Sequence, residues 1–317
     1  MSAIQFVQID LAPMLAALFA ACACALLGNF LVLRRQSLMS DAISHAVLPG
    51  IVLAFILSGT RATAAMFAGA ALAAAITIVL IGLVKRHARL ESGAAMGVVF
   101  SIMFAAGVVL IEQSGARNVD LDADCVLYGQ LEHILWLAPK TLASLREPAV
   151  WLDMPRQVTT LAATFVVCAL AIGLFWKELK IASFDPQLAT ALGFSAGRID
   201  MALMFLVGVV AVAAFESVGS ILVIAMFICP AAAARVLTER LATQVWLSLA
   251  FAAVAALGGY VLAAFGPGWF GSSGSLVASG MIAVVSGVIL AASVLARGRS
   301  RLRFGGATIG TVAANAH

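Results

Sequence analysis

Charged side chains are scarce in this sequence. Only 11% of the 317 residues are Asp, Glu, Lys or Arg, and 63% are hydrophobic, whereas soluble domains have roughly a quarter charged and about half apolar residues. This apolar excess is too large for one buried core, so lipid is the natural solvent for the surplus. The net charge of +4 comes from dispersed basic residues and gives no indication of nucleic-acid binding.

Two motifs of common function classes are also missing. The five cysteines have no metal-finger spacing, and most of them lie in apolar runs, where a thiol behaves as a small hydrophobe. The chain contains no Gly-Lys pair, which excludes the phosphate loop Gly-x-x-x-x-Gly-Lys. If ATP drives this protein, another subunit binds it.

Long apolar runs make up most of the chain. A helix needs ~20 mostly apolar residues to cross the hydrocarbon of a bilayer. The sequence therefore predicts an all-α fold, a polytopic membrane helical bundle with about nine spanning helices. The predicted spans are roughly 11–33, 39–58, 62–84, 93–111, 158–176, 200–216, 218–236, 244–265 and 275–296. We assign residues 1–296 to this transmembrane domain and expect residues 297–317 to form a disordered cytoplasmic tail.

The basic residues indicate the orientation of the bundle, because cytoplasmic loops carry an excess of Lys and Arg. With the N-terminus outside, fourteen of the 19 basic residues fall on the inside and five fall on the outside. The opposite orientation would reverse this ratio. We therefore expect the N-terminus outside and the C-terminus in the cytoplasm.

Two ionisable residues lie within the second predicted span. Asp41 and His45 are four residues apart and share one helix face. His45 would lie about 15 Å along the helix from Arg35, near the middle of the hydrocarbon. Pro49 cannot donate to the His45 carbonyl, so the helix should bend there. A carboxylate, an imidazole and a free carbonyl could bind a divalent metal ion; alternatively, the two side chains only bond each other and a neighbouring helix.

A second proline lies in the seventh predicted span. Pro230 removes the hydrogen bond to the Met226 carbonyl at a similar depth, which is typical of a transport path lined by irregular backbone. Met226 and Cys229 could supply soft ligands to such a path. Packing beside the alanines that follow Pro230 is the commoner role for these residues.

The inside segment 177–199 contains a short apolar helix, at about 185–192, that ends at Gly193. It is too short to span the membrane and suits docking into a groove of a cytoplasmic partner. The alternative is a helix packed on the inner surface of the bundle itself. Its predicted cap, first residue and apolar side chains are Asp185, Pro186, Leu188 and Leu192.

The outside segment 112–157 is acidic and packs three carboxylates around Cys125. Such a cluster could attract cations or contact a delivery protein. A solvated acidic surface with a helix cap is the alternative. The candidate residues for outer entry are Asp120, Asp122, Asp124 and His133.

Three stretches carry a resemblance to one family of transporters. They are Arg-Arg-Gln-Ser-Leu-Met-Ser-Asp-Ala-Ile-Ser-His-Ala-Val-Leu-Pro-Gly at 34–50, Phe-Asp-Pro-Gln-Leu-Ala-Thr-Ala-Leu-Gly at 184–193, and Val-Gly-Ser-Ile-Leu-Val-Ile-Ala-Met-Phe-Ile-Cys-Pro-Ala-Ala-Ala-Ala at 218–234. From about residue 15 to 295 the chain resembles the permeases of ATP-binding-cassette importers for manganese, zinc or iron. The Asp-Cys-Val-Leu-Tyr-Gly stretch at 124–129 is similar to a subset for the same metals.

The resemblance implies a permease subunit in a bacterial plasma (inner) membrane, which provides the translocation path and is not itself an enzyme. It implies two cytoplasmic ATPase subunits, a second permease subunit in a homo- or heterodimer, and an extracytoplasmic metal-binding protein. It also implies that Asp41 and His45 contact the transported divalent ion, which is a substrate and not a permanent cofactor. Glu216 departs from the family pattern and could be an outer-gate acid or a lipid-interface residue.

Two other function classes compete with this interpretation. A stand-alone ion-coupled secondary metal transporter would use Asp41 and His45 as a proton relay, but it would not need a docking helix at 185–192. An intramembrane hydrolase would pair Ser44 or Ser272 with His45. Purification with or without ATPase partners tests the first class, and fluorophosphonate labelling tests the second.

The orientation leads to a labelling prediction. A cysteine placed at Arg86 or Arg89 should react with an impermeant maleimide only from the cytoplasm, and one at Asp122 only from outside, because of the bias in basic residues. Intact cells and inverted vesicles give the two accessibilities. Reaction from the opposite side at these positions would overturn the predicted topology.

Overall fold

The computed structural model describes residues 3–59, 63–88, 90–113, 129, 131–139, 144, 148–269 and 276–313. Throughout this part of the chain the regular structure is helical. The helices are α1 (Ala3–Ile9), α2 (Leu11–Leu33), α3 (Met39–Ala46), α4 (Leu48–Ser58), α5 (Thr63–His87), α6 (Ser92–Gln113), the 3-10 helix η2 (Leu131–His133), α8 (Pro148–Leu152), α9 (Arg156–Leu174), α10 (Trp176–Phe184), α11 (Pro186–Ala191), α12 (Ala196–Leu237), α13 (Leu241–Trp269) and α14 (Ala278–Ala313).

Nine stretches among the described residues are long and apolar enough to cross a membrane, which confirms the predicted polytopic bundle. They are Leu11–Leu33, Met39–Ser58, Ala65–His87, Ser92–Gln113, Arg156–Leu174, Ala196–Phe215, Ser217–Leu237, Leu241–Gly268 and Ala278–Gly298. The predicted boundaries follow these closely. The largest difference is at the sixth span, which starts at Ala196 instead of 200.

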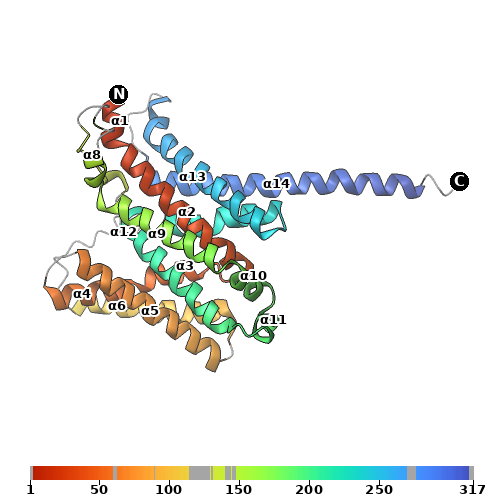
Figure 1. Cartoon of the computed structure of the whole chain (residues 1–317), viewed down its shortest axis with the longest axis horizontal. Coiled ribbons are helices and arrows are strands. Elements are labelled where there is room, and N and C mark those ends of the chain that lie inside the picture. Colours follow the sequence, from red (N-terminus) through yellow and green to blue (C-terminus); the bar gives the residue numbers. More distant parts are fainter. Residues whose placement is uncertain are drawn as a thin grey trace.

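The helices form two groups that meet at α12 (Figure 1). In one group, α2, α9, α13 and α14 pack around α12. In the other, α3 to α6 pack on one another and contact α12 mainly through α3 and α5. Figure 1 shows α4, α5 and α6 set apart from the α2–α13 side of the molecule. Through its contacts, α12 therefore connects the two groups.

Small residues permit the closest helix contacts. A Cβ on Gly28 of α2 would lie 2.0 Å from the Phe227 carbonyl oxygen of α12, so only glycine fits there. At Gly219, α12 has φ 77° and ψ 167°, a backbone conformation that favours glycine. The sixth and seventh spans are thus joined at one bent residue instead of a loop. Pro230, where the sequence predicted a bend, lies within helical backbone.

The last helix, α14, extends beyond the predicted ninth span. α14 continues as a helix to Ala313, past the apolar portion that ends at Gly298. In Figure 1 this extension runs clear of the other helices. The division at residue 296 and the disordered tail over 297–317 stay predictions.

Two adjacent glycines of α13 give a matched stability test. We expect Gly259→Ala to destabilise the α13–α14 contact by about 1–3 kcal/mol, the usual cost of overpacking, because its Cβ would lie 2.5 Å from the Ile282 Cα. A Cβ on Gly258 meets nothing within 4 Å, so Gly258→Ala should gain the roughly 0.5–1 kcal/mol by which alanine favours a helix. Thermal unfolding in detergent compares the two, and equal midpoints would contradict this packing.

Candidate metal site and coupling segment

Asp41 and His45 lie together on one face of α3. The His45 Nε2 is 3.3 Å from a carboxylate oxygen of Asp41. The side chains are 38% exposed for Asp41 and 28% for His45, whereas Met39 and Ile43 on other faces of the helix are buried. In the single chain this pair therefore occupies an open face of the helix.

Two phenylalanines of α6 flank the imidazole. The ring centroid of His45 is 5.4 Å from that of Phe100 and 6.2 Å from that of Phe104. The ring planes of His45 and Phe104 are close to perpendicular, an edge-to-face arrangement that aromatic groups favour. These contacts restrict the movement of the ring and keep its nitrogen near Asp41.

Proline interrupts the helix beside this pair, as the sequence predicts. α3 ends at Ala46 and α4 starts at Leu48, with Val47 between them. Pro49, in the first turn of α4, has no N–H to donate to the carbonyl of His45. The interruption therefore leaves a carbonyl oxygen without its usual helical partner one turn before the proline.

The depth estimate for His45 needs correction. It assumed a continuous helix from Arg35, but residues 34–38 form a turn and α3 begins at Met39. His45 is therefore about 9 Å along its helix, at 1.5 Å per residue. The turn shortens the expected distance because its residues do not advance along the axis of α3.

A single copy of the described chain supplies only part of a metal site. Its described residues contain no group of three or more His, Cys, Asp and Glu that could hold a metal ion. Asp41 and His45 provide two ligand side chains, whereas zinc sites have four ligands and octahedral ions take six. Water, backbone carbonyls or a second chain against the open face of α3 would have to supply the others.

For the other residues predicted to line the path, the described part of the structure shows no common site. Met226 is only 1% exposed and packs inside the bundle, and Cys229 is partly exposed. The side chain of Glu216 lies outside the described residues. A path-lining role for these three residues stays a prediction.

The outer segment is only partly described. Asp120, Asp122 and Asp124 lie outside the described residues, and His133 is exposed in η2. The adjacent Glu132 accepts a hydrogen bond of 2.7 Å from the N–H of Ala278 at the start of α14. This helix-capping contact fixes η2 against α14, and the sequence analysis missed it because the partners are distant in the chain.

The short helix α11 has the predicted caps. An Asp185 carboxylate oxygen accepts from the N–H groups of Gln187 and Leu188 at 3.0 and 2.9 Å. At the other end Gly193 has φ 88°, and the Phe194 N–H donates to the Ala189 carbonyl, which closes a Schellman motif. α11 therefore ends one residue earlier than predicted at its C-terminal side.

The apolar side chains of α11 divide between two surroundings. Ala189 is fully buried against the rest of the chain, whereas Leu188 and Leu192 are 49% and 56% exposed. α11 is thus held on the bundle by Ala189 and presents two leucines outwards. α11 therefore packs on the bundle in part, and docking of its two leucines into a partner stays a prediction.

The hydrolase alternative has no geometric support at Ser44. Its hydroxyl is buried and donates to the Ser40 carbonyl at 2.8 Å, within its own helix. A nucleophile would instead be hydrogen-bonded to its base. Ser272 lies outside the described residues.

The comparisons with known proteins decide the family. The model of the ABC 3 transport family matches residues 7–139 and 152–296. The chain belongs to the ABC 3 transport family. It is a multi-pass membrane permease and not the ATP-hydrolysing subunit, in agreement with the sequence analysis.

The relatives of this permease include proteins named for zinc transport and proteins named for manganese transport. It is 45% identical over 208 residues to the zinc transport system membrane protein TroD of Treponema pallidum, a match that covers 66% of this chain but 54% of TroD. It is 39% identical over 273 residues to the manganese transport system membrane protein MntD of Bacillus subtilis, which covers 86% of each protein.

Among solved structures, the permease is similar to PsaBC from Streptococcus pneumoniae in complex with Fab. The TM-score is 0.68 at 30% sequence identity, over 89% of this chain and 90% of that chain. The same fold therefore extends over most of both chains.

Proposed function

We propose that this permease carries manganese or zinc into the cell as the membrane-spanning subunit of an ATP-binding-cassette importer. The observation that carries this proposal is the Asp41–His45 pair, 3.3 Å apart within a candidate span. Ionisable residues in a membrane are costly and mark ion pathways. The relatives named for zinc and for manganese support these two metals, while iron stays an expectation from the resemblance.

The chemistry of the pair suits these ions. A carboxylate oxygen and an imidazole nitrogen both bind first-row divalent metals, and neither excludes manganese or zinc. The Phe100 and Phe104 rings cover one side of the imidazole. An ion held there is substrate in transit, so a few weak ligands are an advantage for its release.

A second permease subunit fits the open face of α3. Two copies related by a twofold axis would bring two Asp41–His45 pairs towards each other, which doubles the ligands that one chain supplies. A heterodimer with a related permease would act in the same way if it offered similar side chains. The proposal also includes two cytoplasmic ATPase subunits and an extracytoplasmic metal-binding protein.

The capped helix α11 favours this importer over a stand-alone secondary transporter. Its two exposed leucines are suited to a groove on an ATPase subunit. The bias in basic residues places α11 on the cytoplasmic side, with the N-terminus outside and the C-terminus inside. The membrane would accordingly be the bacterial inner membrane.

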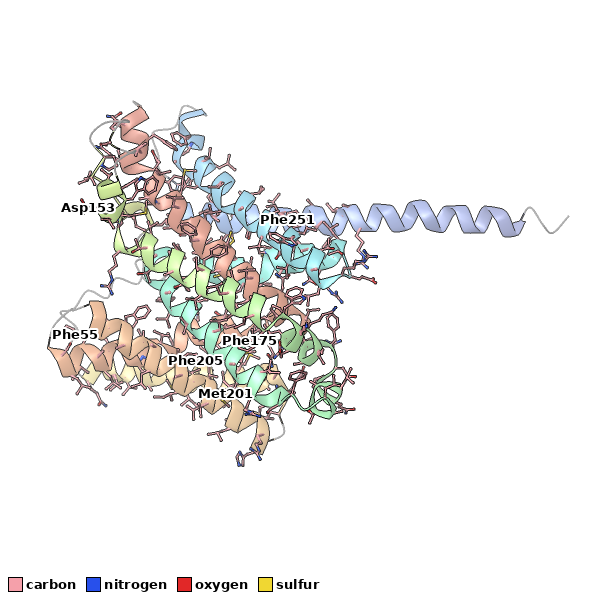
Figure 2. All side chains as sticks on the ribbon, in the orientation of Figure 1. Phe55, Asp153, Phe175, Met201, Phe205 and Phe251 are labelled. Atoms are coloured by element: carbon pink, nitrogen blue, oxygen red, sulfur yellow. The ribbon has the colours of Figure 1, made fainter. Side chains whose placement is uncertain are left out.

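The metal site is tested by removing either ligand. We expect Asp41→Ala or His45→Ala to lower metal uptake by more than the roughly 10–100-fold that loss of a ligand's supporting partner costs. Element-resolved uptake in a strain that lacks the native gene measures this. His87→Ala and Asp153→Ala are matched controls, since both side chains are exposed and belong to other parts of the chain than α3 (Figure 2 labels Asp153). Normal uptake by an assembled Asp41 or His45 variant would remove the pair from the path.

The docking role of α11 is tested at its two leucines. Burying the exposed half of each would contribute about 1 kcal/mol to a docked complex, and a carboxylate in the groove would be costly to desolvate, so the double change Leu188→Asp with Leu192→Asp should abolish co-purification of the ATPase subunits. Asp185→Ala should weaken docking by loss of about 1 kcal/mol of capping. Thr190→Asp adds one negative charge at another exposed position of α11 and is the control, to be compared with Leu188→Asp alone as well as with the double variant. Full co-purification of the double variant would make α11 a surface helix of the bundle only.

A further inference from the structure

A buried guanidinium joins three elements at the end of α2. The side chain of Arg34 is only 8% exposed, and its Nη1 lies 2.7 Å from a carboxylate oxygen of Asp200 in α12. Its Nε donates to the Ser183 hydroxyl of α10 at 3.0 Å. The same side chain therefore holds α12 and α10 while its backbone ends α2.

The backbone at Arg34 is itself tightly held. Arg35 takes a left-handed conformation, φ 55°, which is uncommon for a residue with a side chain. The Gln36 N–H donates to the Leu31 carbonyl at 2.9 Å, and the Arg35 N–H donates to the Val32 carbonyl at 3.2 Å. These bonds close a Schellman motif, so the turn that leads into α3 has a fixed geometry relative to Arg34.

The Ser183 contact lies beside the docking helix. Ser183 is two residues before Asp185, the cap of α11. Its hydroxyl already donates to the Leu179 carbonyl at 2.6 Å, so its oxygen can only accept from Arg34. In Figure 1, α10 and α11 lie near the end of α2 and the start of α12; α10 contacts both α2 and α12, and α11 contacts α10 and α12.

We propose that Arg34 is a positioning residue that ties the ATPase-facing segment α10–α11 to α3, so that movement of α11 is passed to Asp41 and His45. This inference rests on the proposed importer function. The planar guanidinium suits the task because it can bond two partners in fixed directions, which a lysine ammonium does not do. Asp200 neutralises the buried charge and holds the guanidinium against α12.

A purely structural role of Arg34 would give a different result from a role in transmitting movement. If Arg34 only stabilised the fold, its loss would reduce the amount of assembled complex but leave the transport of each remaining complex intact. If it transmits movement, assembled complexes would hydrolyse ATP with less metal carried. Metal uptake per ATP hydrolysed separates these two roles, because loss of protein cancels in the ratio.

The experiment uses the whole complex, with ATPase subunits and metal-loaded binding protein, in proteoliposomes. Uptake of Mn²⁺ or Zn²⁺ and release of phosphate are measured together. We expect Arg34→Ala and Ser183→Ala each to lower uptake per ATP by about tenfold, within the usual range of coupling between sites. Arg35→Gly is the matched control, since it removes the neighbouring exposed charge and keeps the left-handed backbone; it should retain the wild-type ratio.

The double variant with Arg34→Ala and Ser183→Ala tests whether the two residues act together. Because Ser183 acts through Arg34, the Arg34→Ala, Ser183→Ala pair should show no greater loss of uptake per ATP than Arg34→Ala alone. If the Arg34→Ala permease fails to assemble, the Ser183→Ala variant provides the test. This variant should assemble, since it only removes one hydroxyl from a helix. A wild-type ratio in assembled Ser183→Ala would overturn the proposal. Absence of ATP-dependent uptake by the wild-type complex would instead refute the importer function itself.

Discussion

A chain that crosses lipid must satisfy its own backbone hydrogen bonds, and this requirement limits where the helices can be interrupted. The second candidate span is interrupted at Val47, which is buried, and α12 is bent at Gly219, which is also buried. A Cβ on Gly129 would lie 2.4 Å from the Gly219 backbone nitrogen, so the outer segment directly covers that bend. The helical hydrogen bond that Pro49 cannot make and the bend at Gly219 thus both lie where protein shields the backbone. The position of Val47 adjoins His45, so an ion bound there, as proposed, would meet the free His45 carbonyl without polar backbone being exposed to lipid.

Because of its position, α12 connects the two groups of helices. It packs with the α2 group and contacts α3 and α5 of the other group, and Asp200 near its start holds Arg34. α11, the proposed docking helix, contacts α12, and α3, which carries the proposed metal pair, also contacts α12 and follows the turn at the end of α2. The close approach of Gly28 in α2 to Phe227 in the second half of α12 holds these two helices together. A displacement of α11 consequently has a short mechanical route to Asp41 and His45.

Features with a local cause could be predicted from the sequence. Hydrophobic length determines the spans, Asp185 and Gly193 determine the ends of α11, and the four-residue spacing brings Asp41 and His45 together. Contacts between distant residues could not be predicted in this way. Arg34 and Asp200 are 166 residues apart, and Glu132 and Ala278 are 146 apart, so no pattern within a helix reveals either pair. Arg34 contributed to the bias in basic residues and to the motif at 34–50, but neither signal indicated that its side chain is buried and therefore needs a partner. The bend at Gly219 was likewise hidden, because glycine in an apolar run usually indicates close packing.

If Asp41 and His45 bind the transported ion, the ion should be found next to them in the assembled transporter. Crystals of the assembled transporter soaked with Mn²⁺ or Zn²⁺ would show it by anomalous scattering at the edge of the metal. We expect an anomalous peak in the membrane-embedded region at roughly 2.0–2.2 Å from an Asp41 oxygen and a His45 nitrogen. This is the usual length of such bonds to zinc and is close to that of bonds to manganese. A membrane-embedded peak that contacts neither residue would contradict this expectation.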